Sequence, residues 1–129
     1  MSIEDNKALI LSLYNARQQG NFALLDQIIS PDFITLLPGS PQPLRGSEGI
    51  KQMIIHFNNT FHGVNTAIND QIAEGDKVVV IYTTSATTSV PVMGMPPGQQ
   101  LRVVGIDVWQ VMNGKVVNYF GLSQPIPNA

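Results

Sequence analysis

The chain has 129 residues, and only 12% of them are charged, about half of the fraction that is usual in globular proteins. The formal net charge is −2 and the seven basic residues are scattered singly, so the chain lacks the clustered positive charge that binding to nucleic acid or to an anionic membrane requires. Cysteine is absent, which excludes disulfides, thiol nucleophiles and thiolate metal ligands.

These properties predict a single domain over residues 1–129, and they favour a homodimer because so little charge leaves little polar surface to cover a monomer. No apolar run approaches the roughly 20 residues that a membrane helix needs. The N-terminus carries Glu4 and Asp5 where a signal peptide would have basic residues. A cytoplasmic location is therefore expected.

The first part of the chain has helical periodicity. Ser2 and Asp5 form a capping-box pattern, and apolar residues then recur at helical spacing until Gly20, which can end a helix in the left-handed conformation. Asn21 can cap a second, shorter helix that continues through Ile29 and ends before Pro31. Two helices joined by such a short connection must fold back on each other.

A short strand is expected over residues 33–37, followed by a loop over 38–43 that contains three prolines. A third helix should begin at Gly46 or Ser47, the candidate caps, and should end at Gly63. Its apolar residues recur at intervals of three and four and predict one buried face. They are Ile50, Met53, Ile54, Phe57 and Phe61.

From residue 64 onward the pattern is extended. Strands are predicted over 66–73 and 77–88, with a turn at 74–76 between them. Prolines and glycines over 90–100 predict a loop at the edge or mouth of the sheet. A long hairpin over 103–123 is centred on Asn113-Gly114, the dipeptide best suited to a tight hairpin turn, and residues 125–129 are expected to be a loose tail.

Helices first and antiparallel strands afterwards are typical of an α+β domain. The predicted fold is cone-shaped, with three N-terminal helices packed on a curved, mostly antiparallel β-sheet that encloses a pocket. A strongly bent sheet with helices across it leaves a conical cavity, and such cavities bind small apolar ligands.

Asp107 is the most suggestive single residue, because strand alternation places it on one face between Gly105 and Trp109. In a dry pocket, desolvation would raise its pKa and suit it to proton transfer. The alternative is a carboxylate that is hydrogen-bonded by a tyrosine, tryptophan or backbone donor and fixes the sheet. No His-x-x-x-His or Glu-x-x-His pair supplies metal-ligand spacing, so a metal site is not expected.

Several short segments occur in the same order as in a known family. They are Asn6-Lys7-Ala8-Leu9, Gln19-Gly20-Asn21-Phe22, Ser30-Pro31-Asp32-Phe33, Ala73-Glu74-Gly75-Asp76-Lys77-Val78, Met93-Gly94-Met95-Pro96-Pro97, Gly105-Ile106-Asp107 and Asn113-Gly114-Lys115-Val116-Val117. From about residue 6 to residue 123 the chain resembles the SnoaL-like polyketide cyclases of the nuclear transport factor 2-like superfamily. Relatives include ketosteroid isomerases and limonene-epoxide hydrolases. The resemblance implies a cone with a deep apolar pocket, a homodimer, a small hydrophobic molecule as partner, and no metal or organic cofactor.

The chain departs from the family at ionisable positions. Gly121 stands where the cyclases carry their acid, and Asp107 stands where they usually have histidine. Neutral residues replace further family positions at Thr35, Thr88 and Tyr119. Since Tyr119 occupies the position of a family histidine and lies two residues before Gly121, it is a candidate general acid or oxyanion donor.

Two functions follow from the sequence. The first is a cofactor-independent polyketide cyclase or isomerase that acts on a hydrophobic, oxygenated substrate, with Asp107 and Tyr119 as catalytic residues. The alternative is a non-catalytic ligand-binding or dimerisation module that has lost the family's acid/base residues. The apolar 90–100 loop is expected either to cover the ligand or to pack on a dimer partner. The predicted substrate-binding residues are Tyr14, Phe33, Thr35, Tyr82, Thr88, Met93 and Trp109.

Overall fold

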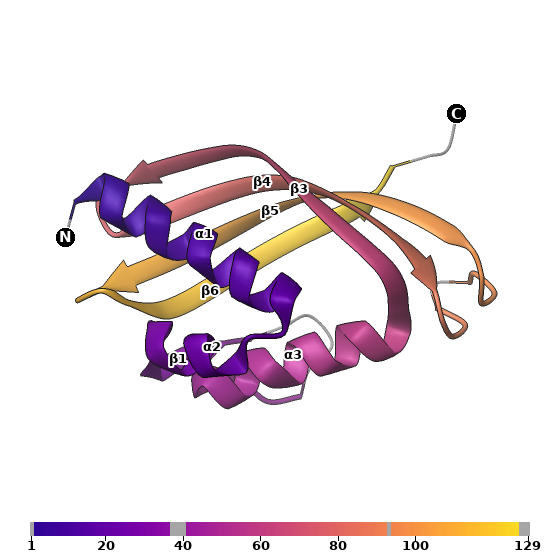
Figure 1. The fold of residues 1–129 in the computed structure, drawn as a ribbon, viewed down its shortest axis with the longest axis horizontal. Helices are drawn as coiled ribbons and strands as arrows, with labels where there is room; N and C mark the ends of the chain where they lie inside the picture. Colours follow the sequence, from indigo (N-terminus) through magenta and orange to yellow (C-terminus); the bar gives the residue numbers. More distant parts are fainter. Residues whose placement is uncertain (1, 37–40, 93, 127–129) are drawn as a thin grey trace.

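The computed structural model describes residues 2–36, 41–92 and 94–126. Within them the helices are α1 (Ile3–Gln19), α2 (Phe22–Ile28) and α3 (Gly46–Thr60). The strands are β1 (Ile29–Thr35), β2 (Leu44–Arg45), β3 (Phe61–Glu74), β4 (Lys77–Thr88), β5 (Gln100–Met112) and β6 (Lys115–Pro125). The strands form one strongly curved sheet, and the helices lie along one side of it (Figure 1). The predicted α+β class is confirmed.

Helix α1 begins and ends at the predicted caps, and α2 begins at its predicted cap. The Ser2 hydroxyl accepts a hydrogen bond from the Asp5 N–H, and the Asp5 carboxylate accepts one from the Ser2 N–H, which completes the capping box. Gly20 ends α1 with φ 67°, the left-handed conformation that glycine adopts without a steric penalty. The Asn21 side chain then accepts from the Leu24 N–H and starts α2.

The sheet has the strand order β2-β1-β6-β5-β4-β3. Neighbouring strands are antiparallel except β1 and β6, which run parallel. The β5–β6 hairpin turns at Asn113 and Gly114, whose φ angles of 53° and 74° confirm the predicted tight turn. Strand β4 has the predicted bounds, and β3 is longer at both ends than predicted.

Several predicted boundaries are wrong. The strand predicted over residues 33–37 is β1 at Ile29–Thr35. Long-range pairing ends α2 and α3 earlier than predicted. Ile29 belongs to β1, where it pairs with Val116. Phe61 belongs to β3, where it pairs with Thr88, so α3 ends before it and Gly63 lies inside the strand. Ser47 does not cap α3, since its hydroxyl hydrogen-bonds Asp26 instead.

Two predicted segments lie partly outside the described residues. Of the proline-rich loop over 38–43, only residues 41–43 are described, and the short strand β2 follows it. Of the predicted tail over 125–129, residues 125 and 126 are described, and the former ends β6.

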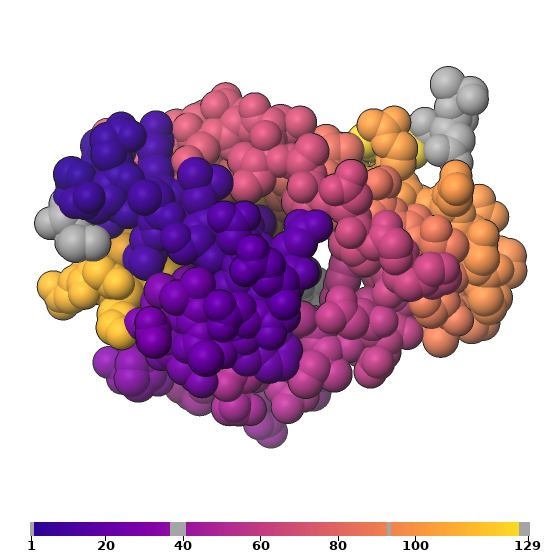
Figure 2. Space-filling model, in the orientation of Figure 1, coloured from indigo at the N-terminus to yellow at the C-terminus, as the bar shows by residue number. Residues whose placement is uncertain are grey.

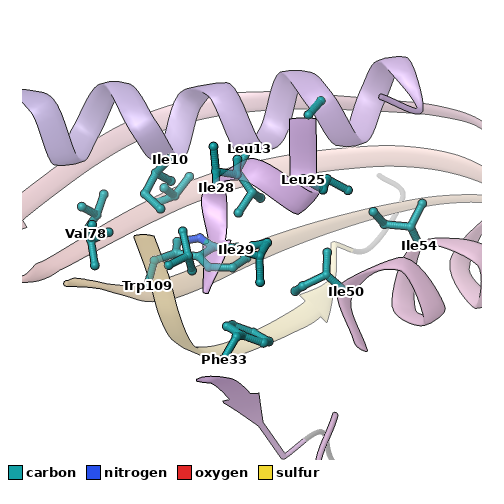
Figure 3. Close-up of a cluster of buried hydrophobic side chains, with 14 residues drawn as sticks. Ile10, Leu13, Leu25, Ile28, Ile29, Phe33, Ile50, Ile54, Val78 and Trp109 are labelled. Carbon is teal, nitrogen blue, oxygen red and sulfur yellow. The ribbon is translucent and has the colours of Figure 1, made fainter. Parts of the chain in front are cut away.

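The core fills the space between the helices and the facing side of the sheet (Figure 3). Ile10 and Leu13 from α1 and Leu25 from α2 pack over Val78 and Trp109 of the sheet. Phe33 of β1 and the α3 residues Ile50 and Ile54 extend the same cluster. No helix in the described ranges combines the length and apolar character that spanning a membrane would require.

Candidate active site

Asp107 lies near the middle of β5 on the side that faces the helices, and only 3% of its surface is exposed. The Tyr14 hydroxyl, from α1, donates a hydrogen bond to its Oδ2 atom. The Tyr119 hydroxyl, from β6, donates to its Oδ1 atom at 3.0 Å. Both oxygens of a buried carboxylate are therefore satisfied by phenols, as a buried charge requires.

Trp109 extends this arrangement. Its indole Nε1–H donates to the Tyr14 hydroxyl oxygen at 3.0 Å, and the two rings meet edge to face with centroids 6.0 Å apart. On the other side, the Trp109 and Tyr119 ring centroids are 4.4 Å apart, because the two residues are a cross-strand pair. We call Asp107, Tyr14, Tyr119 and Trp109 the Asp107 network.

Two glycines make room for the tyrosine rings. Gly121 pairs with Asp107 across the β5–β6 ladder, and a Cβ atom at this position would collide with the Tyr119 hydroxyl and lie 2.6 Å from Asp107 Oδ1. Gly105 pairs with Tyr82, and a Cβ atom there would lie 2.6 Å from Tyr82 Cε1. Each phenol therefore lies across a glycine, in space that any other side chain would occupy.

Burial is the largest influence on the pKa values of the site residues. It raises the pKa of Asp107, while the hydrogen bonds from Tyr14 and Tyr119 and the positive charge of Arg17 offset part of that rise. Burial and the Asp107 charge raise the pKa of Tyr14 and of Tyr119 well above the ordinary value. The same two causes raise the pKa of Tyr82 to about 12. All three phenols therefore keep their protons at neutral pH.

Asp107 and Tyr14 line a cavity of about 460 Å³. It lies between the last turn of α1, the end of α3, and strands β3, β4 and β5. A hollow is visible at this place in Figure 2, beside the C-terminal end of α1. Apolar side chains line one part, including Ile54, Phe57 and Val64, whereas neutral polar groups such as Thr66 and Ser123 line another. Its volume is within the range of small-molecule sites.

Arg17 also lines the cavity, and the sequence interpretation missed it. It lies three residues after Tyr14, a spacing that places both side chains on one face of α1. Its guanidinium stands over the Phe57 ring of α3, 5.3 Å from the ring centroid. The helical spacing from Tyr14 is the signal that could have identified it.

The structure brings together five of the predicted site residues. Asp107, Tyr14, Tyr119 and Trp109 form the network, and Tyr82 lines the cavity beside it. Trp109 and Tyr119 support Asp107 from the core and do not themselves line the cavity.

Three other predicted substrate-binding residues do not line the cavity. Phe33 is buried in the core. The Thr35 hydroxyl donates to the Tyr119 carbonyl oxygen, which ties β1 to β6. Thr88 is fully buried near the end of the sheet, and Met93 lies outside the described residues.

The loop between β4 and β5 is attached to Thr88. The Thr88 hydroxyl donates to the Pro96 carbonyl and accepts from the Gln99 N–H, while the Thr88 carbonyl accepts from the Gly98 N–H. None of the described residues of this loop lines the cavity. In the described part of the chain, the expectation of a lid over the ligand has no support.

A curved, mixed sheet with three helices on its concave side is the nuclear transport factor 2-like fold. An NTF2-like protein from Burkholderia xenovorans superposes with a TM-score of 0.78 at 15% identity, over 96% of this chain and 92% of that one. A SnoaL-like polyketide cyclase from Agrobacterium tumefaciens gives a TM-score of 0.79 at 11% identity, over 96% and 93%. TsrD from Streptomyces laurentii gives 0.80 at 23% identity, over 96% and 91%.

The family model of the SnoaL-like polyketide cyclases matches residues 8–125. The chain belongs to this family, whose members bind small polyketide-like molecules. A comparison with curated proteins finds none that matches.

Proposed function

We propose that the chain is a cofactor-independent enzyme that transfers protons on a hydrophobic, oxygenated small molecule, in an aldol cyclisation or an isomerisation. The observation that carries the proposal is the placement of Asp107, a buried carboxylate that borders a cavity of about 460 Å³. Burial raises its pKa, and a base with a raised pKa is a stronger proton acceptor at neutral pH. Family membership supports the same chemistry.

In this proposal Asp107 takes a proton from a carbon atom next to a substrate carbonyl, which forms an enolate. In a cyclisation the enolate carbon bonds to a second carbonyl carbon, and the resulting alkoxide takes the proton back from Asp107. In an isomerisation the proton returns to another carbon atom. In this proposal the phenol of Tyr82, a residue that lines the cavity, donates a hydrogen bond to a substrate oxygen. Tyr14 and Tyr119 hold the carboxylate in position.

The test uses a reaction that reports a buried base without knowledge of the natural substrate. In the ring opening of a nitrobenzisoxazole, the carboxylate takes the ring C–H proton while the N–O bond breaks, and a coloured cyanophenolate forms. We expect the protein to accelerate this reaction and Asp107→Asn to lower the rate about a hundredfold or more, the usual worth of a positioned base. Asp32→Asn, which changes an exposed aspartate, is the matched control.

The pH dependence has a defined sign. The carboxylate form of Asp107 is the active form, and its folded pKa is raised, so the rate should fall as pH drops through that raised pKa and reach a plateau above it. A full rate in Asp107→Asn, or a rate that does not fall in acid while the protein stays folded, would remove Asp107 from the mechanism.

A second candidate function is a ligand-binding or dimerisation module without catalysis. Both oxygens of Asp107 already accept phenol hydrogen bonds, which is also what a purely structural carboxylate would show. In that case the cavity would bind apolar ligands equally well in the protein and in Asp107→Asn, and neither would open the nitrobenzisoxazole ring.

We also propose that the protein is a homodimer that joins through the face of the sheet opposite the helices. Ile106, Phe120 and Leu122 on this face are 48%, 59% and 60% exposed. Ile106 pairs with Leu122 across the β5–β6 ladder, and Val108 pairs with Phe120, so the apolar residues are contiguous. An apolar patch that spans several strands is typical of an interface.

A further inference from the structure

The most distinctive charge at the cavity is that of Arg17. In the described residues the ion pairs are those of Lys51 with Asp26 and Glu48, so no described carboxylate lies at ion-pair distance from the Arg17 guanidinium. The guanidinium N–H groups of Arg17 also donate no side-chain hydrogen bond to another described residue. The side chain is half-buried, in a chain with only 12% charged residues.

Two structural roles of Arg17 are visible, and neither uses its N–H groups. Its charge in the last turn of α1 interacts favourably with the helix dipole. Its positive charge lies over the Phe57 ring in a cation–π contact. The N–H donors lie in the plane of the guanidinium and point along its edges, where they match the two oxygens of a carboxylate. Half-buried donors of this kind favour an oxygen anion as partner.

The remaining lining suits a ligand with two different ends. Ile54, Phe57, Val64 and Val103 provide apolar contacts, and the amides of Asn15 and Asn58 are uncharged. Asp107 is the one carboxylate among the described lining residues, whose other ionisable side chains are Arg17 and the phenols Tyr14 and Tyr82. An anionic group would thus be attracted to Arg17 and kept away from Asp107, which orients the ligand in the cavity.

We propose that Arg17 is the anion-binding residue of this cavity and that the natural ligand is an apolar, oxygen-bearing molecule with a carboxylate or another oxygen anion at one end. The inference rests on the proposed small-molecule function and narrows its substrate class. It places the anionic end at the last turn of α1 and the reacting end at Asp107.

A matched pair of fluorescent probes tests the proposal. Anilinonaphthalene sulfonate and phenylnaphthylamine share the same aromatic body and differ by the sulfonate. Arg17→Gln should weaken binding of the sulfonate about tenfold or more, the loss expected for a charge-assisted hydrogen bond. Binding of the neutral probe should change by less than about twofold, since the apolar contacts are retained. Arg45→Gln removes one exposed positive charge outside the cavity and serves as the control.

The unmodified protein provides a second test that needs no variant. A medium-chain fatty acid should displace the neutral probe at a concentration about tenfold lower than its methyl ester, although the ester is more apolar. Equal losses of both probes in Arg17→Gln, no loss of the sulfonate, or stronger displacement by the ester would each overturn the inference.

These outcomes separate the inference from the proposed catalysis. Asp107→Asn removes the base but keeps Arg17, so it should still prefer the sulfonate over the neutral probe. If the protein opens no nitrobenzisoxazole ring yet loses sulfonate binding in Arg17→Gln, the anion site stands and the proton-transfer function fails. If the ring-opening reaction depends on Asp107 while Arg17→Gln binds both probes normally, the proton-transfer function stands and the anion site fails.

Discussion

At the scale of single residues, the site depends on what Tyr119 and Gly121 do together. The Tyr119 ring extends along β6 until its hydroxyl lies over Gly121 and donates to Asp107. A larger residue at position 121 and this hydrogen bond exclude each other, because both need the same space. Gly121 is therefore a positioning residue for the phenol.

Gly121→Ala should displace the Tyr119 hydroxyl from Asp107. The carboxylate would lose a hydrogen bond that favours its charged form, so the pKa of Asp107 would rise further and the midpoint of the pH–rate profile would move to higher pH. Overpacking should also cost about 1–3 kcal/mol of unfolding free energy. The pH dependence of nitrobenzisoxazole opening measures the first effect and urea denaturation the second.

Tyr119→Phe removes the same hydrogen bond without adding an atom to the sheet. It should move the pH midpoint in the same direction as Gly121→Ala, and the two changes together should not add. An unchanged midpoint in Gly121→Ala would mean that the hydrogen bond from Tyr119 to Asp107 does not require glycine at position 121.

At the scale of elements, the loop between β4 and β5 is attached to the end of β4. Thr88 attaches it, since its buried hydroxyl hydrogen-bonds both Pro96 and Gln99. These contacts lie beyond the residues that line the cavity. The loop and the site should therefore respond independently to substitution.

Thr88→Val tests this independence, because valine has nearly the same shape and no hydroxyl. The change removes the hydrogen bonds to the Pro96 carbonyl and the Gln99 N–H, so we expect a loss of about 0.5–1.5 kcal/mol in unfolding free energy for each bond. Amide hydrogen exchange over residues 94–99 should accelerate, while nitrobenzisoxazole opening should not change. Thr87→Val, on the neighbouring and less buried residue, is the control. A matching fall in catalysis would indicate that the loop does take part in the site.

Local signals explain which elements could be predicted from the sequence. The capping box at Ser2 and the turn at Asn113-Gly114 depend on neighbouring residues only, and both were predicted correctly. The end of α3 depends on the pairing of Phe61 with Thr88, 27 residues away, which the helical spacing of Phe61 conceals. The parallel pairing of β1 with β6 is likewise set by distant residues.

The site follows the same division. Strand alternation was enough to place Asp107 and Trp109 on the buried face. The two phenols that bind Asp107 come from α1 and β6, so their meeting depends on how the helix crosses the sheet. The helical spacing of Arg17 from Tyr14 showed that the two residues share a face of α1, but that this face borders a cavity depends on how α1 and α3 pack on the sheet.

At the scale of the whole molecule, one face of the sheet is covered by the helices and the other is exposed. The helices cover the face that carries the Asp107 network (Figure 1). The opposite face presents apolar residues from β3, β5 and β6, and Ile72 of β3 pairs with Val79 beside this patch. Exposing such a surface is unfavourable, and a second copy of the same face would bury it symmetrically.

Charge on this face should therefore separate the proposed dimer. Phe120→Lys with Leu122→Lys places two positive charges at the centre of the patch. In a symmetric interface these lysines would lie opposite the same two lysines of the partner subunit. Because like charges repel, association should weaken by at least about a hundredfold. Light scattering at micromolar concentration should give a dimer mass for the protein and a monomer mass for the variant. Ile55→Lys, at an exposed apolar residue of α3, should remain a dimer. A monomer mass for the unmodified protein would refute the proposed interface, whereas a dimer that persists in the double variant would move it to another surface.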